Sequence, residues 1–349
     1  MKKFVIDIQL FLLASIVCLA FVGNGCAPAP QKTPQPVRRI ESPQRLISTA
    51  PSITEILFDI GIGERIVGDS RFTTYPPETK EIEKIGGLYD GNWERIVELK
   101  PDLVLVLAKN EDFRLQCEKL GIESLSVEHG SMEGVLASYD LIGERFGQEV
   151  MQAAQARKIV LAEKLSTLRA KGESLPPVRV LICIDRERES GQLQNVYVAG
   201  TSPYFQDAIR WAGGINVAET TGLAFPCMSA EGILALNPDV IVDLMIGEVV
   251  RLAVSTSADE PEKKEDELIA DWKTLGNTVN AVKTGRIFIL TENYATIPGP
   301  RTPLLVEKLF EILHGEPIKQ TSNDFGTSPT SESTIDKESN GSVKHDDKH

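Results

Sequence analysis

Histidine and cysteine, the side chains that most often bind transition metals, are scarce in this sequence. Its 349 residues include four histidines and five cysteines. Zinc and manganese sites are usually built from several converging histidine, cysteine and carboxylate side chains. His345 and His349 lie in a polar tail, and His129, in a Glu-His-Gly sequence at the end of a predicted strand, is typical of a loop histidine. We therefore expect no bare transition-metal site and no resident cofactor.

Basic residues are also in deficit, since 37 Lys and Arg stand against 50 Asp and Glu, giving a formal net charge of −13. Nucleic-acid binding depends on basic side chains that neutralise phosphates and release counterions. This charge balance excludes nucleic acid as a partner. Apolar residues make up 42% of the chain and charged residues 25%, the composition of a folded globular protein of about two domains.

Two common enzyme signatures are incomplete. Gly61-Ile62-Gly63 follows a predicted helix instead of a strand, and Ile66 stands where a dinucleotide-binding loop needs its third glycine. Gly200-Thr201-Ser202 runs directly into a proline, so it does not form the strand–nucleophile–helix turn of a serine hydrolase. The sequence therefore favours binding over catalysis.

The first 25 residues have the layout of a secretory signal peptide. A short basic start precedes an apolar run over residues 8–22, and small residues lead to Cys26. Cys26 and the proline-rich segment 26–43 resemble the processing site and tether of a bacterial lipoprotein. We expect residues 1–25 to be removed and Cys26 to be lipidated, with plain cleavage or an uncleaved anchor as alternatives. The protein is then exported and held on the outer face of the cytoplasmic membrane or in the periplasm.

Three further cysteines, Cys117, Cys183 and Cys227, remain after such processing. Their number is odd and none forms a C-x-x-C pair, so at most one disulfide is expected. Cys183 lies inside the apolar run VRVLICI, which is typical of a small buried side chain.

Strand-like and helix-like segments alternate in two separate parts of the chain. The elements predicted in the first part are strands at 45–48, 103–107 and 123–127 and helices from residue 51 and at 93–99. Those predicted in the second part are strands at 178–184 and 240–244 and helices at 202–212 and 229–236. Ser52 with Glu55 three residues later predicts a capping box at the first helix.

One helix-to-strand unit occurs in both parts. Residues 93–107 (WERIVELKPDLVLVL) and 230–244 (AEGILALNPDVIVDL) share Glu, Ile, Leu and Pro-Asp at matching positions before an apolar strand. Continuous apolar strands are typical of buried parallel sheets. The sequence therefore predicts an α/β protein with two similar lobes around parallel central sheets, over residues 44–147 and 172–315.

The segment between the lobes, Gln148 to Lys171, contains no proline or glycine and is rich in helix-forming residues. A helix of about 24 residues is roughly 36 Å long, enough to cross from one lobe to the other. We expect this rigid connection to limit lobe closure. The polar segments 259–267 and 316–349 predict a solvated loop and a disordered acidic tail.

Several aromatic residues lie near predicted strand ends in both lobes. They are Phe72, Tyr75, Tyr89, Trp93, Tyr197, Phe225 and Tyr294. Ligands of α/β proteins bind beyond strand ends, so these side chains are expected to face a common cleft between the lobes. Flat aromatic faces suit a large, partly apolar ligand.

Four stretches of the sequence resemble one protein family. Residues 45–107, 198–218, 229–241 and 285–301 look, in this order, like the cobalamin and iron-siderophore binding proteins of bacterial ABC importers, the helical-backbone class of periplasmic binding proteins. The resemblance implies two α/β lobes, an interlobe cleft and one long connecting helix. It also implies an ABC permease and its ATPase as partners, a monomeric protein and no catalysis.

The resemblance also implies roles for individual residues. Glu94 and Glu231, one on each lobe, match the glutamates that dock into arginine pockets of the permease in this family. Phe72, Tyr197 and Phe225 match cleft aromatics of the cobalamin binder. Leu88, Leu107 and Ile184 stand where that protein has other aromatics. Tyr75 opens a Tyr-Pro-Pro segment closest to the corrinoid branch, and Arg301 is expected at the cleft rim, where it would pair with a carboxylate or phosphate of the ligand.

Together these features favour a corrinoid, cobalamin, as the ligand. A ferric siderophore or haem is the alternative, since both are iron complexes taken up by the same family. A lipoprotein that sequesters a metal complex, or that signals, without any permease is an alternative of a different class. Glu94 and Glu231 argue against it.

Overall fold

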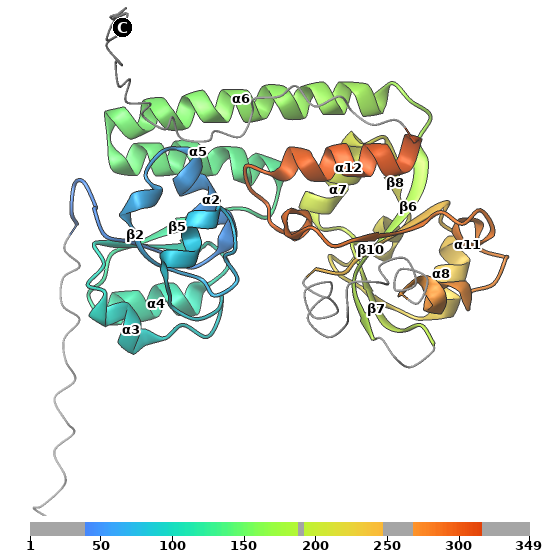
Figure 1. Cartoon of the computed structure of the whole chain (residues 1–349), viewed down its shortest axis with the longest axis horizontal. Helices are drawn as coiled ribbons and strands as arrows, with labels where there is room; N and C mark the ends of the chain where they lie inside the picture. The colour runs from blue at the N-terminus through green and yellow to red at the C-terminus, as the bar shows by residue number, and fades with distance from the viewer. Residues whose placement is uncertain (1–38, 188–191, 247–267, 316–349) are drawn as a thin grey trace, which may run out of the picture.

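The computed structural model of the chain describes residues 39–187, 192–246 and 268–315. The predictions for the signal peptide 1–25, lipidation of Cys26, the tether up to residue 38, the loop at 259–267 and the tail at 316–349 lie outside the described residues. Figure 1 shows the described chain as two lobes side by side, with one long helix lying across both. The α/β class and the two-lobed architecture predicted from the sequence are confirmed.

The N-terminal lobe contains a five-stranded sheet in which every strand is parallel to its neighbours. Its order is β3-β2-β1-β4-β5. The strands are β1 (Leu46–Ser48), β2 (Ile66–Asp69), β3 (Glu83–Lys84), β4 (Leu103–Leu107) and β5 (Ser124–Val127). The helices are α2 (Pro51–Asp59), α3 (Trp93–Glu98), α4 (Glu111–Lys119) and α5 (Met132–Phe146), with short 3-10 turns η1 (Gly63–Arg65) and η2 (Pro77–Glu81).

Strand β4 shows why this sheet is buried on both faces. Leu103, Leu105 and Leu107 pack in one apolar cluster with α2 and α5, whereas Val104 and Val106 pack in another with residues of α3 and α4. Successive side chains of a strand point to opposite faces, so a continuous apolar run fits a sheet covered by helices on both sides. The strand predicted at 103–107 is confirmed residue for residue.

The C-terminal lobe contains a mixed sheet of order β11-β10-β6-β7-β9, with β8 beside the start of β6. Its strands are β6 (Val178–Glu187), β7 (Gln194–Val198), β8 (Gly214–Asn216), β9 (Cys227–Met228), β10 (Val240–Leu244) and β11 (Ile287–Leu290). Its helices are α7 (Pro203–Trp211), α8 (Ala230–Leu236), α11 (Asn280–Lys283) and α12 (Thr302–His314), with 3-10 turns η3 (Val217–Thr221) and η4 (Asn293–Thr296); residues 268–273 are also helical.

The prediction of a parallel sheet is wrong for part of this second lobe. Strand β7 runs antiparallel to both β6 and β9. The reason is the short connection between β6 and β7, because a chain that returns within a few residues can only pair antiparallel. Strands β6, β8, β10 and β11 are parallel, as predicted.

The interlobe helix is α6 (Gln148–Glu173), two residues longer than predicted. Helix α5 of the first lobe and helices α7 and α12 of the second pack against it. Arg157 of α6 pairs with Asp59 of α2 at 2.7 Å, and Lys164 pairs with Glu307 of α12 at 3.3 Å. The buried apolar cluster on this side runs without a break through both lobes. The helix is therefore fastened to each lobe by charge as well as by packing.

The capping box predicted at the first helix is not formed. Helix α2 begins at Pro51, Ala50 occupies the N-cap position, and no side chain accepts a hydrogen bond there. Proline suits the first turn because its missing N–H has no intrahelical partner in any case. Ser52 and Glu55 both lie within the helix, and both residues are buried. Glu55 points instead toward the second lobe, where it has a different partner.

Candidate functional site

The predicted aromatic residues lie on both lobes and keep much of their surface exposed. On the first lobe, Phe72 is 52% exposed and Tyr75 is half-buried, both in the loop after β2. On the second lobe, Tyr197 is 44% and Phe225 is 51% exposed. Tyr197 lies within β7 itself instead of in a loop beyond a strand. Large apolar side chains with this much exposure are available to a ligand.

The loop that carries Phe72 and Tyr75 is held by one lysine of β3. Lys84 Nζ donates to Asp69 Oδ1 at 2.7 Å and to the backbone carbonyls of Thr73 at 3.2 Å and Thr79 at 3.0 Å. Asp69 is fully buried, and burial raises its pKa to about 6 although the Lys84 ammonium opposes the shift. A single ammonium therefore fixes both ends of the loop that bears the aromatics.

Phe225 is positioned by main-chain hydrogen bonds from the segment after β7. Gly200 N donates to Ala224 O at 2.9 Å, and Thr201 N donates to Leu223 O at 2.7 Å. A Cβ at position 200 would lie 2.0 Å from the Leu223 carbonyl oxygen, so this close approach requires glycine. The Phe225 ring also meets Phe205 of α7 edge-on, with ring centroids 6.5 Å apart. The aromatic of the second lobe thus rests on a backbone contact and a buried ring.

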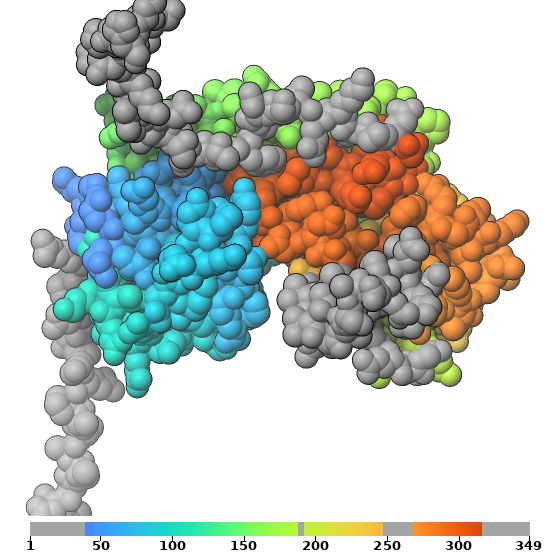
Figure 2. All heavy atoms as spheres, viewed as in Figure 1, coloured from blue at the N-terminus to red at the C-terminus, as the bar shows by residue number. Residues whose placement is uncertain are grey.

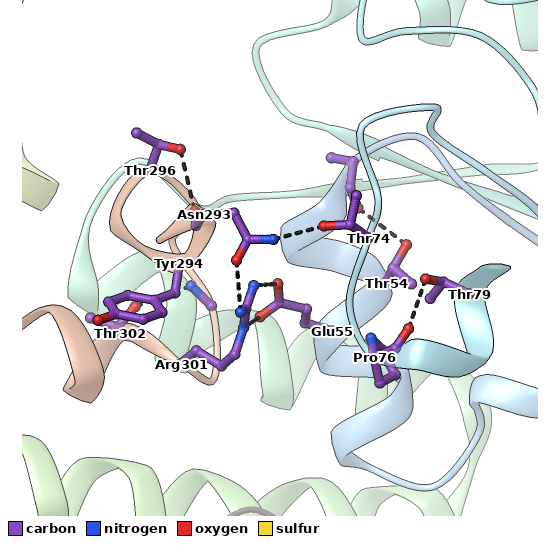
Figure 3. A network of polar contacts seen from close by, with 12 residues as sticks. Thr54, Glu55, Thr74, Pro76, Thr79, Asn293, Tyr294, Thr296, Arg301 and Thr302 are labelled. Carbon is purple, nitrogen blue, oxygen red and sulfur yellow. Dashed lines mark hydrogen bonds and ion pairs between the residues drawn. The ribbon is translucent and has the colours of Figure 1, made fainter. Parts of the chain in front are cut away.

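The two lobes touch through a polar network shown in Figure 3. Arg301, just before α12, donates through Nη2 to Glu55 Oε1 at 2.6 Å and through Nε to Glu55 Oε2 at 3.0 Å. Arg301 Nη1 donates to Asn293 Oδ1 at 2.9 Å, and Asn293 Nδ2 donates to Thr74 Oγ1 at 2.7 Å. The guanidinium also lies 4.1 Å from the centre of the Tyr75 ring. Pairs of residues that are 219 and 246 positions apart in the sequence therefore meet at one contact.

Burial dominates the electrostatics of this contact. Glu55 is 3% exposed and Arg301 is 7% exposed. Desolvation raises the pKa of Glu55 above its usual value, although its hydrogen bonds and charge attraction to Arg301 act in the opposite direction. The bidentate geometry is the strongest form of a carboxylate–guanidinium pair.

The expected position of Arg301 at the cleft rim is not observed. Its side chain is buried at the contact between the lobes, and Nε, Nη1 and Nη2 all donate to protein acceptors. Direct pairing of Arg301 with a ligand stays a prediction, and it requires Glu55 or Asn293 to release the guanidinium first.

Sequence reasoning missed Glu55, Asn293 and Thr74 as members of this contact. The signal that was available is the position of Glu55 among Ile53, Ile56 and Leu57, where a carboxylate on a buried helix must find a cationic partner. A capping role explained the same residue from local sequence alone, so the distant arginine was not sought.

Below this contact the surface of the molecule is hollowed between the lobes (Figure 2). The contact between the loop after β2 and the η4 segment closes the inner end of this hollow. We call this contact the interlobe floor, and its residues are Glu55, Thr74, Tyr75, Asn293, Tyr294 and Arg301.

The two acidic residues predicted to dock are both exposed in the first turn of a helix. Glu94 lies in α3 and Glu231 in α8, which both lie on the side of the molecule away from α6 (Figure 1). The N-cap residues Asn92 and Ser229 accept hydrogen bonds from the backbone N–H three residues on. A hydrogen bond from its own backbone N–H, and one with Ser229, lower the pKa of Glu231. The repeated unit found in the sequence thus presents an equivalent carboxylate on each lobe.

The described ranges contain neither a cluster of metal-binding side chains nor a membrane-spanning helix. Within residues 39–187, 192–246 and 268–315, no three His, Cys, Asp or Glu side chains gather as a metal site would need. In the same ranges, no helix combines the length and the apolar character required to span a bilayer.

Two α/β lobes lie on one continuous helix, and each lobe carries exposed aromatic side chains, Phe72 on the first and Tyr197 and Phe225 on the second, an arrangement typical of a substrate-binding protein. The sequence model of the periplasmic binding protein family matches residues 46–294. The chain belongs to this family, in the branch that serves iron-complex and vitamin B12 importers, and is the substrate-binding component of an ABC importer.

Similar proteins come from several bacteria. The uncharacterized ABC transporter substrate-binding lipoprotein YvrC of Bacillus subtilis (strain 168) is 28% identical over 337 residues, 88% of this chain and 97% of its own. A vitamin B12-binding protein of Vibrio parahaemolyticus is 25% identical over 283 residues, 80% of this chain and 92% of its own.

Solved structures share the fold. The periplasmic heme-binding protein RhuT of Roseiflexus sp. RS-1, in apo form, superposes with a TM-score of 0.64 at 25% identity, over 78% of this chain and 98% of its own. The vitamin B12-binding protein BtuF of Vibrio cholerae superposes with a TM-score of 0.62 at 22% identity, over 78% of this chain and 96% of its own.

Proposed function

We propose that this substrate-binding protein captures a corrinoid, cobalamin, in the hollow between its lobes and delivers it to an ABC permease. The observation that carries the proposal is the set of aromatics on the two lobes, the exposed Phe72 and the half-buried Tyr75 on one and the exposed Tyr197 and Phe225 on the other. A corrin is a wide, flat and partly apolar ring system, and aromatic faces on both sides suit such a body. Relatives named as vitamin B12-binding proteins support the proposal.

Haem or a ferric siderophore is the second candidate. The similarity to the heme-binding protein RhuT favours it. Haem is also flat and partly apolar, so the aromatics alone do not discriminate between a corrin and a porphyrin. The two candidates differ in the charge at the ring edge, because haem carries two propionates whereas a corrin carries amides.

Ligand titration tests the proposal directly. The chain produced from residue 27 is titrated with cyanocobalamin, haemin and a ferric hydroxamate in parallel, followed by tryptophan and tyrosine fluorescence. We expect tight binding of cyanocobalamin alone. Phe72→Ala, Tyr197→Ala and Phe225→Ala should each weaken it about tenfold, since a lost aromatic contact is worth about 1.4 kcal/mol. Binding of an iron complex in place of cyanocobalamin would overturn the corrinoid assignment.

A matched control uses an exposed apolar residue elsewhere. Ile159 of α6 is 56% exposed, like the aromatics, but it lies on the connecting helix. Ile159→Ala should therefore leave the affinity for cyanocobalamin unchanged. An equal loss in this variant would show that the effect of the aromatic substitutions is general.

We further propose that Glu94 and Glu231 dock into basic pockets of the permease. Both are exposed carboxylates, and charge pairs at the rim of an interface set orientation and association rate. The double variant Glu94→Ala/Glu231→Ala should abolish uptake in cells that depend on this importer, with the affinity for ligand unchanged. Glu144→Ala/Glu149→Ala, which removes the same charge from the exposed surface near the α5–α6 junction, should transport normally. Wild-type uptake by the first pair would refute the docking role.

Anchoring through Cys26 completes the proposed function. The lipoprotein YvrC, which is similar over most of its length, supports it. We expect the full chain to label with radioactive palmitate and to fractionate with membranes. Cys26→Ser should lose the label, and unchanged labelling would refute acylation at this residue.

A further inference from the structure

Glu55 and Arg301 form an ion pair that joins the two lobes at the inner end of the hollow. Glu55 comes from α2 of the first lobe and Arg301 from the segment before α12 of the second. Their side chains are 1% and 8% exposed, and the closest oxygen and nitrogen are 2.6 Å apart. A buried pair of opposite charges is neutral as a unit, and its field outside the pair is weak.

Each nitrogen of the guanidinium already donates to a protein acceptor. Nε and Nη2 donate to the two oxygens of Glu55, and Nη1 donates to Asn293. Tyr75 covers one face of the guanidinium plane at 4.1 Å. The interlobe floor therefore contains an arginine whose charge is balanced by a buried carboxylate within the protein.

Among the residues that the structure describes, a second arginine that contacts a predicted ligand aromatic is neutralised in the same way. Arg71 lies 5.1 Å from the centre of the Phe72 ring, and its Nη2 is 2.7 Å from Asp90. This second pair is half-exposed, so solvent screens it more strongly than the buried pair. Each of the two arginines beside the aromatic surface of the first lobe is thus matched by its own carboxylate.

We infer that Glu55 is a specificity-determining residue. By neutralising Arg301 it removes the charge attraction that would favour ligands with carboxylates, so that ligands with an uncharged edge are not at a disadvantage at the floor. The inference rests on the proposed function, because it concerns the choice between ring systems of similar size. An amide-edged corrin loses nothing at a neutral floor. A haem or an anionic siderophore loses the attraction that a free guanidinium would supply.

The expected magnitude follows from Coulomb's law. One unit charge acting across ~10 Å at an effective dielectric constant of ~20 changes an affinity by about tenfold. Removing the carboxylate of Glu55 changes the floor from neutral to +1, whereas removing the guanidinium of Arg301 adds no positive charge, because an unpaired buried carboxyl favours its neutral form. The preference between an anionic and a neutral ligand should therefore follow the charge of the pair.

Two corrins that differ only at their edge and tail test this dependence in any binding orientation. Dicyanocobinamide carries amides around the ring, and dicyanocobyrinic acid carries carboxylates. Both are titrated into the wild-type chain and into three variants: Glu55→Gln, Arg301→Gln and the double variant Glu55→Gln/Arg301→Gln. Circular dichroism and thermal melting report whether each variant is folded.

We expect the wild type to prefer the amide corrin. Glu55→Gln should shift the ratio of the two dissociation constants at least tenfold toward the carboxylate corrin, and Arg301→Gln should show no shift in that direction. The double variant, which is neutral again, should return to the wild-type ratio. If Glu55→Gln does not fold, Arg301→Gln decides the question, because a shift of this variant toward the carboxylate corrin would overturn the inference.

Glu123→Gln is the matched control. Glu123 pairs with Arg145 of α5 at 2.8 Å, and both side chains are largely buried within the first lobe. It should leave the ratio unchanged. An unchanged ratio in folded Glu55→Gln, or an equal shift in Glu123→Gln, overturns the role of Glu55 and leaves the corrinoid function standing. A wild type that binds neither corrin refutes the proposed function and the inference with it.

Discussion

Replacing Asp69 by asparagine should change how the stability of this protein depends on pH. Asp69 is fully buried at the end of β2, and Lys84 Nζ donates to its Oδ1 at 2.7 Å. Its Oδ2 is buried and accepts no hydrogen bond from the described residues. One carboxylate oxygen therefore has a hydrogen-bond partner, whereas the other is buried without one. Ionising such a carboxyl costs more free energy in the folded chain than in the unfolded chain, where water solvates both oxygens.

The sign follows from the pKa, which burial raises from 3.8 to about 6. The folded state then binds the Asp69 proton more tightly than the unfolded state, so the free energy of unfolding falls as the pH rises through this range. One pKa unit corresponds to ~1.4 kcal/mol, so the whole titration amounts to about 3 kcal/mol, of which about 1.4 kcal/mol lies between about pH 5 and about pH 7.5. The side-chain amide in the Asp69→Asn variant does not titrate, so the variant lacks this contribution.

Chemical denaturation at these two pH values measures the difference. The free energy of unfolding of the wild type relative to Asp69→Asn should fall by about 1–2 kcal/mol between the lower and the higher pH. Asp90→Asn is the control, because the Asp90 side chain is 60% exposed and its pair with Arg71 is solvated. A difference between wild type and Asp69→Asn that stays constant with pH, or moves in the opposite direction, would refute the reasoning.

Two further predictions concern the second lobe. Gly200→Ala should lower the free energy of unfolding by about 1–3 kcal/mol, since its Cβ would meet the Leu223 carbonyl oxygen at 2.0 Å. Ligand titration should also show weaker binding, because the segment that carries Phe225 must move. Wild-type values in both assays would contradict this prediction. Cys227 is exposed whereas Cys117 and Cys183 are buried, and burial raises the pKa of both buried thiols, so mass spectrometry of the native chain from residue 27 should find a maleimide on Cys227 alone. Tyr197 and Cys227 are paired across β7 and β9, so bound corrinoid should slow this modification, and an unchanged rate would place the ligand elsewhere.

The sequence predicted those parts of the fold that depend on local pattern. The apolar run at 103–107 and the uninterrupted helix from Gln148 became β4 and α6 with little change at their ends. A helix was predicted at 229–236, and α8 begins directly after Ser229, whose side chain accepts a hydrogen bond from Gly232 N. The direction of β7 was not predictable in the same way, since strand pairing depends on how the chain returns and not on which residues are apolar.

The same distinction between local pattern and tertiary arrangement applies to the candidate site. Aromatics near strand ends were visible in the sequence, and Phe72 and Phe225 are exposed as a ligand-binding role requires. The pair of Glu55 and Arg301 was not visible, because its partners are 246 residues apart and each satisfied a simpler local explanation. Ion pairs between distant segments follow from the tertiary fold, so they are the part of a site that single-sequence reasoning finds last.

We expect the continuous helix α6 to keep the separation of the two lobes nearly constant. It has 26 residues and is about 39 Å long, and ion pairs connect it to α2 of one lobe and to α12 of the other. Glu94 and Glu231 would then keep one spacing whether the hollow is empty or full. With docking by these two carboxylates, empty and loaded protein would compete for the same importer on equal terms, and the rate of delivery would depend on the fraction of the protein that carries ligand.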